Sequence, residues 1–354
     1  MNPHPQSIPQ PQSPTLVQVR AADALIAVVP YLLGFHPEDS LVVLALSQSD
    51  SRVRLAFRFD LPDPPDRAIT AEIVRHAVVL LTRNEFGDAV IIGYGPGTLV
   101  TPMADLARQV LPDAGIRLHD VLRVQDGRCW SYLCTDPSCC PAEGLPVGTG
   151  NHPAGAVLVG AGLAAAPSRD ALAVTIAPLT GPEGDAMTEA TAQAEQAAVR
   201  LAAASRPRAL LADGLAAVQH AITTYRAGGT LRSAGEFARL TVALTSLRIR
   251  DDGWARMDPA HQAAHLRLWT DLTRRARPGY VAAPASLLAF TAWQAGDGAL
   301  ANLALDRALA DQPDYSMALL LRDALAACLP PAVARLPMTP EEVAASYDDL
   351  GRDH

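Results

Sequence analysis

The sequence predicts an α/β domain with a mixed sheet, followed by an all-α domain. Up to about residue 150, short apolar or alternating runs typical of strands interchange with helical periodicity. From Pro153 onward the strand patterns nearly vanish, and Ala-rich helical stretches follow one another between Pro and Gly residues. We therefore expect domains at 15–150 and 151–330, flanked by a disordered Pro/Gln-rich tail at 1–14 and a loosely held, Pro-rich acidic tail at 331–354.

The composition is that of a folded, acidic protein. Hydrophobic residues make up 49% of the chain and aromatic residues 5%, so we expect a sizeable core built mostly of Ala, Leu and Val. The net charge of −8 disfavours binding to nucleic acid or to an anionic membrane, both of which attract a basic surface. There is no apolar run of about 20 residues and no signal-peptide pattern. We therefore expect a cytoplasmic protein with reduced thiols.

The first elements of the α/β domain follow from hydrophobic spacing. Apolar residues at helical intervals predict a helix over 25–33 that Pro30 kinks. A continuous apolar run at 41–46 predicts a buried strand, and the alternating run at 53–59 predicts its half-exposed hairpin partner. A second helix is expected from about 66 to 84.

The remaining elements of this domain are a strand, a helix and a second hairpin. A buried strand at 89–92 leads through glycine-rich residues into a helix whose expected cap is Thr101. Asp126-Gly127 is a tight-turn signal between two strand-like runs, 116–124 and 128–134, which we expect to pair antiparallel.

The second half of the chain is predicted to be purely helical. The helical stretches cover 168–177, 183–205, 208–227, 234–248, 259–276, 284–295, 298–311 and 315–328.

The segment 284–314 is similar to one tetratricopeptide repeat unit. Gly296-Asp297 occupies the turn, and Ala301, Ala308 and Pro313 follow at the repeat's usual intervals. Ala285 departs from the pattern, because the repeat usually has a bulky residue there. The alternative is an ordinary helical hairpin with small residues at its crossing. An all-α, tetratricopeptide-like domain would offer a groove for a protein partner.

The stretch "CTDPSCCP" concentrates three of the five cysteines. Its residues 136–139 have the composition of a tight turn, which would bring Cys134 close to Cys139. Three interpretations stay open: a zinc site formed by Cys134, Cys139 and Cys140, a redox or nucleophilic thiol, and a structural loop with buried thiols.

The spacing favours the structural loop over zinc. Cys139 and Cys140 are adjacent, and adjacent side chains on extended backbone point apart. A fourth zinc ligand would have to come from a distant residue, His119 or His152. No cofactor is therefore assigned from the sequence.

Two further loops contain residues suited to a site. The loop 34–40 holds His36, Asp39 and Ser40 as candidate catalytic residues, beside Glu38. The alternative, which we favour, is a turn whose polar side chains bond to backbone amides.

The second loop lies between a strand and a helix. Its residues Gly93, Gly95, Gly97 and Thr98 are candidates for holding an anion at the helix start. It matches neither nucleotide-binding glycine motif, and the alternative is a tight strand-to-helix turn. In the helical domain, His261 and His265 lie one turn apart, and we expect a solvated or partly buried pair.

Three segments together carry a family resemblance. "PYLLGFHPEDSLVVLAL", "WSYLCTDPSCCPAEG" and "LLAFTAWQAGDGALANLALDRALADQPDYSMALLL" resemble the domain-of-unknown-function family 4192 of high-GC Gram-positive bacteria. The resemblance extends from about Val17 to Leu329. It implies the architecture and marks the special loops, but implies no activity, substrate or cofactor.

Two hypotheses of function follow. The first is an adaptor whose helical domain binds a protein partner. The second is an enzyme or small-molecule sensor whose site joins the loops 34–40, 93–98 and 134–140 at one edge of the sheet. The sequence leaves the oligomeric state open.

Overall fold

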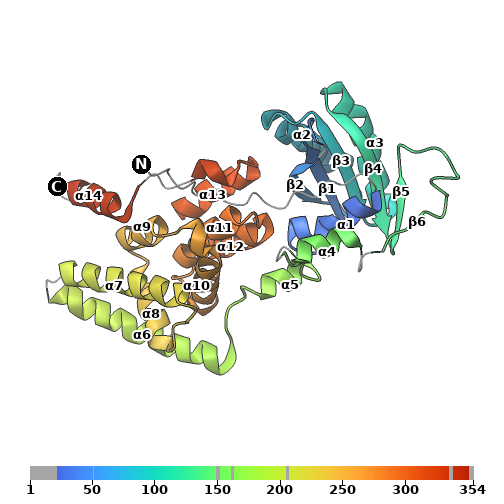
Figure 1. The fold of residues 1–354 in the computed structure, drawn as a ribbon. Helices are drawn as coiled ribbons and strands as arrows, with labels where there is room; N and C mark the ends of the chain where they lie inside the picture. The colour runs from blue at the N-terminus through green and yellow to red at the C-terminus, as the bar shows by residue number, and fades with distance from the viewer. Residues whose placement is uncertain are drawn as a thin grey trace, which may run out of the picture. The chain divides into compact units, whose positions relative to one another are not determined.

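The computed structural model describes residues 22–50, 52–148, 152–160, 163–204, 207–334 and 338–350. The chain divides into two compact units, Met1–Arg169 and Asp170–His354. The first contains the sheet, and helices are the only regular elements in the described residues of the second (Figure 1). The predicted fold class is therefore confirmed.

The strands of the first unit form one mixed, six-stranded sheet in the order β2-β1-β3-β4-β5-β6. Only β3 and β4 run parallel; every other neighbouring pair is antiparallel. The strands are β1 (Ser40–Leu46), β2 (Val53–Asp60), β3 (Asp88–Tyr94), β4 (Arg117–Gln125), β5 (Arg128–Ser131) and β6 (Leu145–Pro146).

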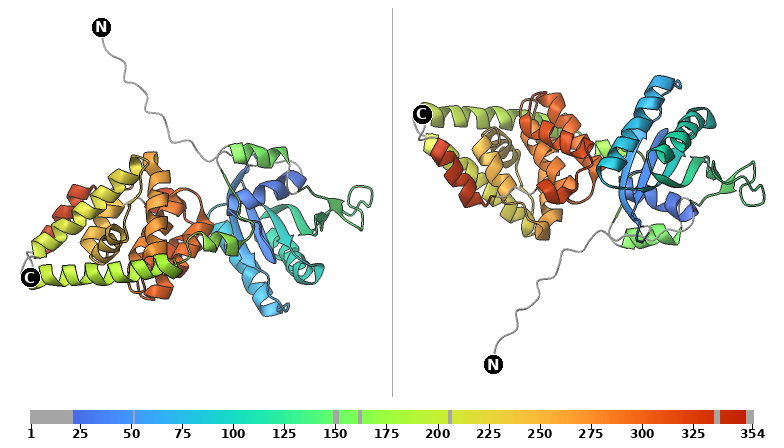
Figure 2. Two further views of the ribbon diagram at one scale, coloured as in Figure 1. Left: turned by 90° about the horizontal axis from the view of Figure 1, so that it is seen from below. Right: turned by 90° about the horizontal axis from the view of Figure 1, so that it is seen from above.

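Helices cover both faces of this sheet. The helices of the unit are α1 (Ala22–Leu33), α2 (Arg67–Arg83), α3 (Gly97–Asp113) and α4 (Pro153–Gly160); the next helix, α5 (Arg169–Val174), starts at the last residue of the unit. Figures 1 and 2 show α2 and α3 on one face, and α1 with α4 on the other. The central strands β1 and β3 are buried along their whole length because both of their faces are covered.

The core beneath α2 and α3 follows the alternation of the strands. Val43 of β1 and Ile91 of β3 point to this face and pack with Leu81 of α2 and Met103 of α3. The side chain of Asp66 fixes the start of α2 by accepting hydrogen bonds from two backbone amides of the first turn.

The division between the units falls later in the chain than the sequence predicts. The predicted boundary near Asn151 lies outside the described residues, and the observed division follows Arg169. The reason is α4, which packs on α1. Gly155 allows this close approach, because a side chain there would press against the Tyr31 ring and the Ala27 carbonyl oxygen.

The second unit is built from antiparallel helices. They are α6 (Gly181–Ala203), α7 (Pro207–Arg226), α8 (Ala234–Ala243), α9 (Leu247–Ala255), η1 (Pro259–His261), α10 (Gln262–Arg275), α11 (Ala282–Gln294), α12 (Gly298–Asp311), α13 (Ser316–Ala326), η2 (Pro331–Ala334) and α14 (Pro340–Leu350). None of the helices within the described ranges combines the length and the apolarity needed to cross a membrane.

The hairpin of α11 and α12 has the small-residue crossing that the sequence predicts. Ala289, Ala301 and Ala308 are completely buried, and Gly296 adopts a φ of 80° in the turn between the helices. At the other end of the hairpin, the Asp311 carboxylate accepts hydrogen bonds from backbone amides at the start of α11. These contacts fix α11 and α12 side by side.

Of the two tails that the sequence predicts, only the C-terminal one can be compared with the structure. The predicted tail at 1–14 lies outside the described residues. The segment after Pro330 is predicted to be loosely held, yet it contains α14, which packs on α9.

Candidate metal centre

The cysteine loop connects β5 to β6 and is fixed at its base. The guanidinium of Arg128 donates to the carbonyl oxygens of Glu143 and Gly144, and the indole N–H of Trp130 donates to the carbonyl oxygen of Ala142. Gly144 has a φ of 78°, and a side chain there would overlap the Trp130 ring. The returning end of the loop therefore has one position that requires glycine.

A second set of hydrogen bonds fixes the outgoing end. The Ser131 hydroxyl accepts from the backbone amides of Leu133 and Cys134, each at 3.1 Å. It donates to Asp120 Oδ1 at 2.7 Å. Asp120 lies on β4, so this chain of bonds ties Cys134 to the sheet.

A tight turn at Asp136 orients the other two cysteines. Its carbonyl oxygen accepts from the backbone amides of Cys139 and Cys140, at 3.1 and 2.7 Å. Its carboxylate accepts from both the amide and the hydroxyl of Ser138. The turn signal in the sequence is thereby confirmed.

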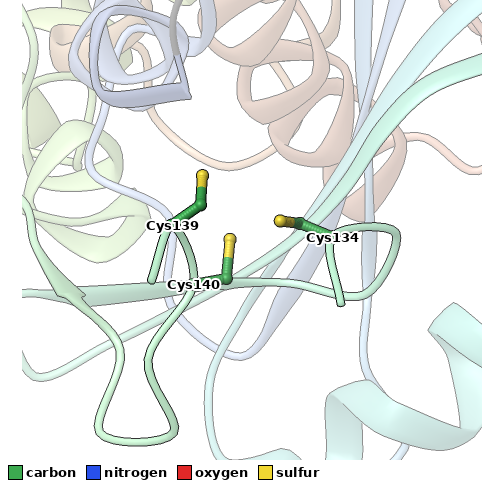
Figure 3. Close-up of side chains that lie close together, drawn as sticks. All are labelled: Cys134, Cys139 and Cys140. Atoms are coloured by element: carbon green, nitrogen blue, oxygen red, sulfur yellow. The ribbon is translucent and has the colours of Figure 1, made fainter. Parts of the chain in front are cut away.

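The turn brings all three thiols together. The Sγ atoms of Cys134, Cys139 and Cys140 lie within 4.8 Å of one another. Figure 3 shows the three side chains directed toward a shared space. The expectation that Cys139 and Cys140 point apart is wrong, because it assumes extended backbone and these residues lie in a turn.

This separation is close to what a metal ion requires. With Zn–S bonds of about 2.3 Å, three sulfurs on one zinc ion lie about 3.8–4.0 Å apart. A displacement of less than about 1 Å at each sulfur would therefore bring the three to the spacing that one zinc ion requires. The group fits a thiophilic metal ion such as zinc, and three thiolates are a donor set that zinc accepts.

The thiols are accessible and interact with one another. Cys139 is exposed and its two partners are half-buried, unlike the buried thiols of a purely structural loop. Hydrogen bonding from Cys140, and then from the Asp136 amide, lowers the pKa of Cys134. The bond to Cys134 in turn raises the pKa of Cys140 to about 12. Deprotonation of Cys134 is thus favoured over that of an isolated thiol, and a second thiolate forms against a neighbouring negative charge.

The two histidines considered as a fourth ligand are engaged elsewhere. His119 Nε2 lies 2.6 Å from Asp88 Oδ1, and His152 Nε2 lies 3.5 Å from Asp23 Oδ2. Within the described part of the chain, the cluster contains the three cysteines alone. A zinc ion held by these three cysteines would therefore take its fourth ligand from outside this cluster.

Among the described residues, the hydrogen bonds of the candidate catalytic residues in the loop 34–40 go to other groups rather than to one another. Ser40 is completely buried; its hydroxyl donates to the carbonyl oxygen of Glu38 and accepts from Arg58 Nε at 2.6 Å. Asp39 has a φ of 40°, and no hydrogen bond among the described residues joins the His36 side chain to either residue. The Ser40 side chain therefore holds the turn, although it bonds to a carbonyl oxygen rather than to an amide.

Packing explains the glycines of the loop 93–98. A side chain at Gly93 would overlap Val100, and one at Gly97 would press on the guanidinium of Arg123. Gly95 has a φ of 139°. Helix α3 starts at Gly97 after Pro96, so Thr101, the expected cap, lies inside the helix and bonds to the Tyr132 hydroxyl. Thr98 is in the first turn, where no side chain caps the helix.

Two of the three predicted loops lie directly side by side, and the third starts from β5, toward the opposite edge of the sheet. Ser40 pairs with Tyr94, and Asp39 approaches Gly95, so the first two loops share one sheet edge. β5 runs antiparallel to β4 and ends toward the opposite edge. There Leu133 lines a surface depression with Arg117 and Leu118, the first residues of β4. The base of the cysteine loop nevertheless stays linked to the start of α3, because the Tyr132 hydroxyl bonds to Thr101 and the Trp130 ring lies 3.7 Å from the guanidinium of Arg123, which is beside Gly97.

Comparison with known proteins identifies a family and nothing more specific. The family described as "Domain of unknown function (DUF4192)" matches residues 23–332, which confirms the resemblance seen in the sequence. No curated protein and no solved structure matches the chain. Because the match spans well over half of the sequence, this chain belongs to the DUF4192 family.

Proposed function

We propose that this protein binds one zinc ion through Cys134, Cys139 and Cys140, and that the fourth coordination position receives an exogenous ligand. The observation that carries the proposal is the convergence of three accessible sulfurs within 4.8 Å on a loop held at both ends. Structural zinc sites have four protein ligands, whereas sites that act on a ligand keep one position open. Reduced thiols are required, as expected in the cytoplasm.

Competition with a chromogenic chelator under reducing conditions tests the proposal. We expect one zinc ion per chain, and a loss of affinity of at least about tenfold in Cys134→Ser, Cys139→Ser and Cys140→Ser. Cys328→Ala is the matched control, since Cys328 is a half-buried thiol in the other unit. Failure of the reduced protein to bind zinc, or equal affinity in all four variants, would overturn the proposal.

A protein-interaction role for the helical unit stays a second proposal. It is supported by the α11–α12 hairpin and by the apolar side chains on the following helix, where Leu319 is 41% and Leu320 70% exposed. Two consecutive exposed leucines favour a surface that binds a partner protein.

Site-specific photo-crosslinking tests this role. A crosslinking residue at Leu320 should capture one defined protein from a cytosolic extract. The same residue at Val79 of α2, which is also exposed (53%), should capture none. Identical products from both positions would contradict the proposal.

A further inference from the structure

The three clustered thiols lie on a loop that contains no helix or strand. This loop runs from the end of β5 at Ser131 to the start of β6 at Leu145. Hydrogen bonds fix both of its ends to the sheet, whereas Cys139 near its middle is exposed and Cys134 and Cys140 are half-buried. A rearrangement within the loop therefore leaves the strand pairing intact, and small molecules in the solvent reach the sulfurs.

Covalent geometry limits which two of these sulfurs can form a bond with each other. A disulfide requires Cα atoms about 4.4–6.8 Å apart, whereas the Cα atoms of consecutive residues are about 3.8 Å apart. Cys139 and Cys140 are consecutive, so a disulfide between them would be strained. An unstrained disulfide within the cluster therefore includes Cys134.

Cys140 is the better placed of the two possible partners of Cys134. The hydrogen bond that joins the Cys134 thiol to Cys140 is stronger than the one that joins it to Cys139. Figure 3 shows the Cys134 side chain directed toward the other two. The sulfurs lie within 4.8 Å of one another, so they need to approach by less than about 3 Å to reach the S–S bond length of about 2.05 Å. A change of one side-chain rotamer is a displacement of that order.

We propose that Cys134 and Cys140 form a disulfide when the protein meets a hydroperoxide, and that this disulfide switches off the zinc site. The bond uses two of the three sulfurs and leaves Cys139 as a single ligand. Zinc binds to thiolate sulfur, so the oxidised site should release the ion. The release of zinc rests on the proposed function, whereas formation of the disulfide does not.

The reaction balances with a hydroperoxide as its one co-reactant. One sulfur attacks the hydroperoxide, the O–O bond breaks, and the sulfur becomes a sulfenic acid while an alcohol, or water in the case of hydrogen peroxide, leaves. The second sulfur then attacks the first, an S–S bond forms, and the oxygen of the sulfenic acid leaves as water. The two thiols together lose two electrons and two protons, and the hydroperoxide accepts all of them.

The other two cysteines of the chain serve as internal controls. Cys129 is 4% exposed on β5, and Cys328 is half-buried in the helical unit. Neither belongs to the cluster of three sulfurs. Access and a neighbouring thiol together favour oxidation to a disulfide, so we expect Cys129 and Cys328 to stay reduced.

Mass spectrometry of the full-length, reduced wild type tests the inference. The protein is treated with hydrogen peroxide, its free thiols are alkylated, and it is digested with trypsin. The peptide 129–169, which contains four cysteines, should carry two alkyl groups instead of four, and dithiothreitol should restore the other two. In the chelator competition, the zinc affinity of the oxidised protein should be lower by at least about a hundredfold and should recover with dithiothreitol.

Cysteine variants identify the two sulfurs. Cys134→Ser should abolish the disulfide, and Cys140→Ser should slow its formation by at least about tenfold, because only the weaker contact with Cys139 then remains. Cys139→Ser and Cys328→Ala should form it as the wild type does.

Three results would overturn the inference: four alkyl groups on the peptide after peroxide, an unchanged disulfide in Cys134→Ser, or an unchanged zinc affinity in the oxidised protein. A reduced wild type that binds no zinc would contradict the proposed function instead. The alkylation pattern of the same sample still decides whether the disulfide forms, so the two failures are distinguishable.

Discussion

Ser131 is the residue through which the sheet positions the first cysteine. Its hydroxyl accepts from the Cys134 amide and donates to Asp120 on β4. Outer groups that orient metal ligands typically contribute about 10- to 100-fold to metal affinity. We therefore expect Ser131→Ala to lower zinc affinity by about tenfold while leaving the stoichiometry at one ion per chain, as measured by chelator competition. Ser49→Ala, in the loop after β1, should leave the affinity unchanged.

His265 gives the helical unit a pH-dependent stability. Burial, and then the positive charge of Arg226, lowers its pKa to about 4, although Asp258 acts in the opposite direction and His261 adds to the lowering. The unfolded residue has a pKa near 6.5, so the unfolded chain binds a proton that the folded chain refuses between about pH 4 and 6.5. The contribution of His265 to the free energy of unfolding is therefore fully present above about pH 6.5 and is lost as the pH falls toward 4.

The size of that loss follows from the two pKa values and is about 3 kcal/mol. Urea unfolding near pH 7.5 and near pH 5 should show a markedly smaller pH effect in His265→Gln than in the wild type. His220→Gln, with a largely exposed side chain, is the control. Retention of the full pH effect in His265→Gln would show that other groups cause it.

The sequence predicts that His261 and His265 form a solvated or partly buried pair, whereas His265 is only 2% exposed in the structure.

At the scale of single residues, the sequence identifies the cysteines but not their geometry. Convergence of the sulfurs depends on the turn at Asp136 and on the Ser131–Asp120 bond, which joins residues of different strands. The spacing of the cysteines in the sequence does not reveal a hydrogen bond between side chains of two different strands. The same holds for Ser40, whose hydroxyl is occupied by Arg58 of the neighbouring strand.

At the scale of elements, local sequence signals correctly predict elements that pair with their immediate neighbour in the chain. Asp126 and Gly127 have φ values of 50° and 70°, as a tight hairpin turn requires, and β4 and β5 pair as expected. The start of α3 is missed because Pro96 precedes it and Pro102 falls inside it. The expected helix 234–248 ends at Ala243 as α8, and after a turn a new helix, α9, starts at Leu247 and continues to Ala255.

The crossing of α11 and α12 yields a stability prediction. Ala308 is completely buried between the helices, so Ala308→Leu overfills the contact and should cost about 1–3 kcal/mol of unfolding free energy. Ala310→Leu, two residues along the same helix at an exposed position, should cost little. Chemical denaturation followed by tryptophan fluorescence measures both. A similar cost at both positions would argue against a tightly packed hairpin crossing.

At the scale of the whole molecule, the division into a sheet-bearing unit and a helical unit can be predicted from the change in periodicity. The position of the division cannot be predicted in this way. Helix α4 has no polar face that would reveal it as a surface helix, and its packing on α1 places it in the first unit. The family match crosses both units, from residue 23 to 332.

The two units should respond differently to zinc. Ligand binding stabilises the folded region that holds the ligand, by about 2.7 kcal/mol at a hundredfold excess over the dissociation constant. Hydrogen exchange should therefore slow across residues 131–144 when zinc is added, and stay unchanged in α6–α13. Equal slowing in both units would contradict a site confined to the cysteine loop.

The most direct test of the account is X-ray absorption spectroscopy of the zinc-loaded, full-length protein. We predict three sulfur neighbours at about 2.3 Å and one oxygen or nitrogen neighbour. The same spectrum from Cys139→Ser should show fewer sulfur neighbours. A zinc ion surrounded only by oxygen and nitrogen would contradict the three-cysteine site, and a fourth sulfur would contradict the open coordination position.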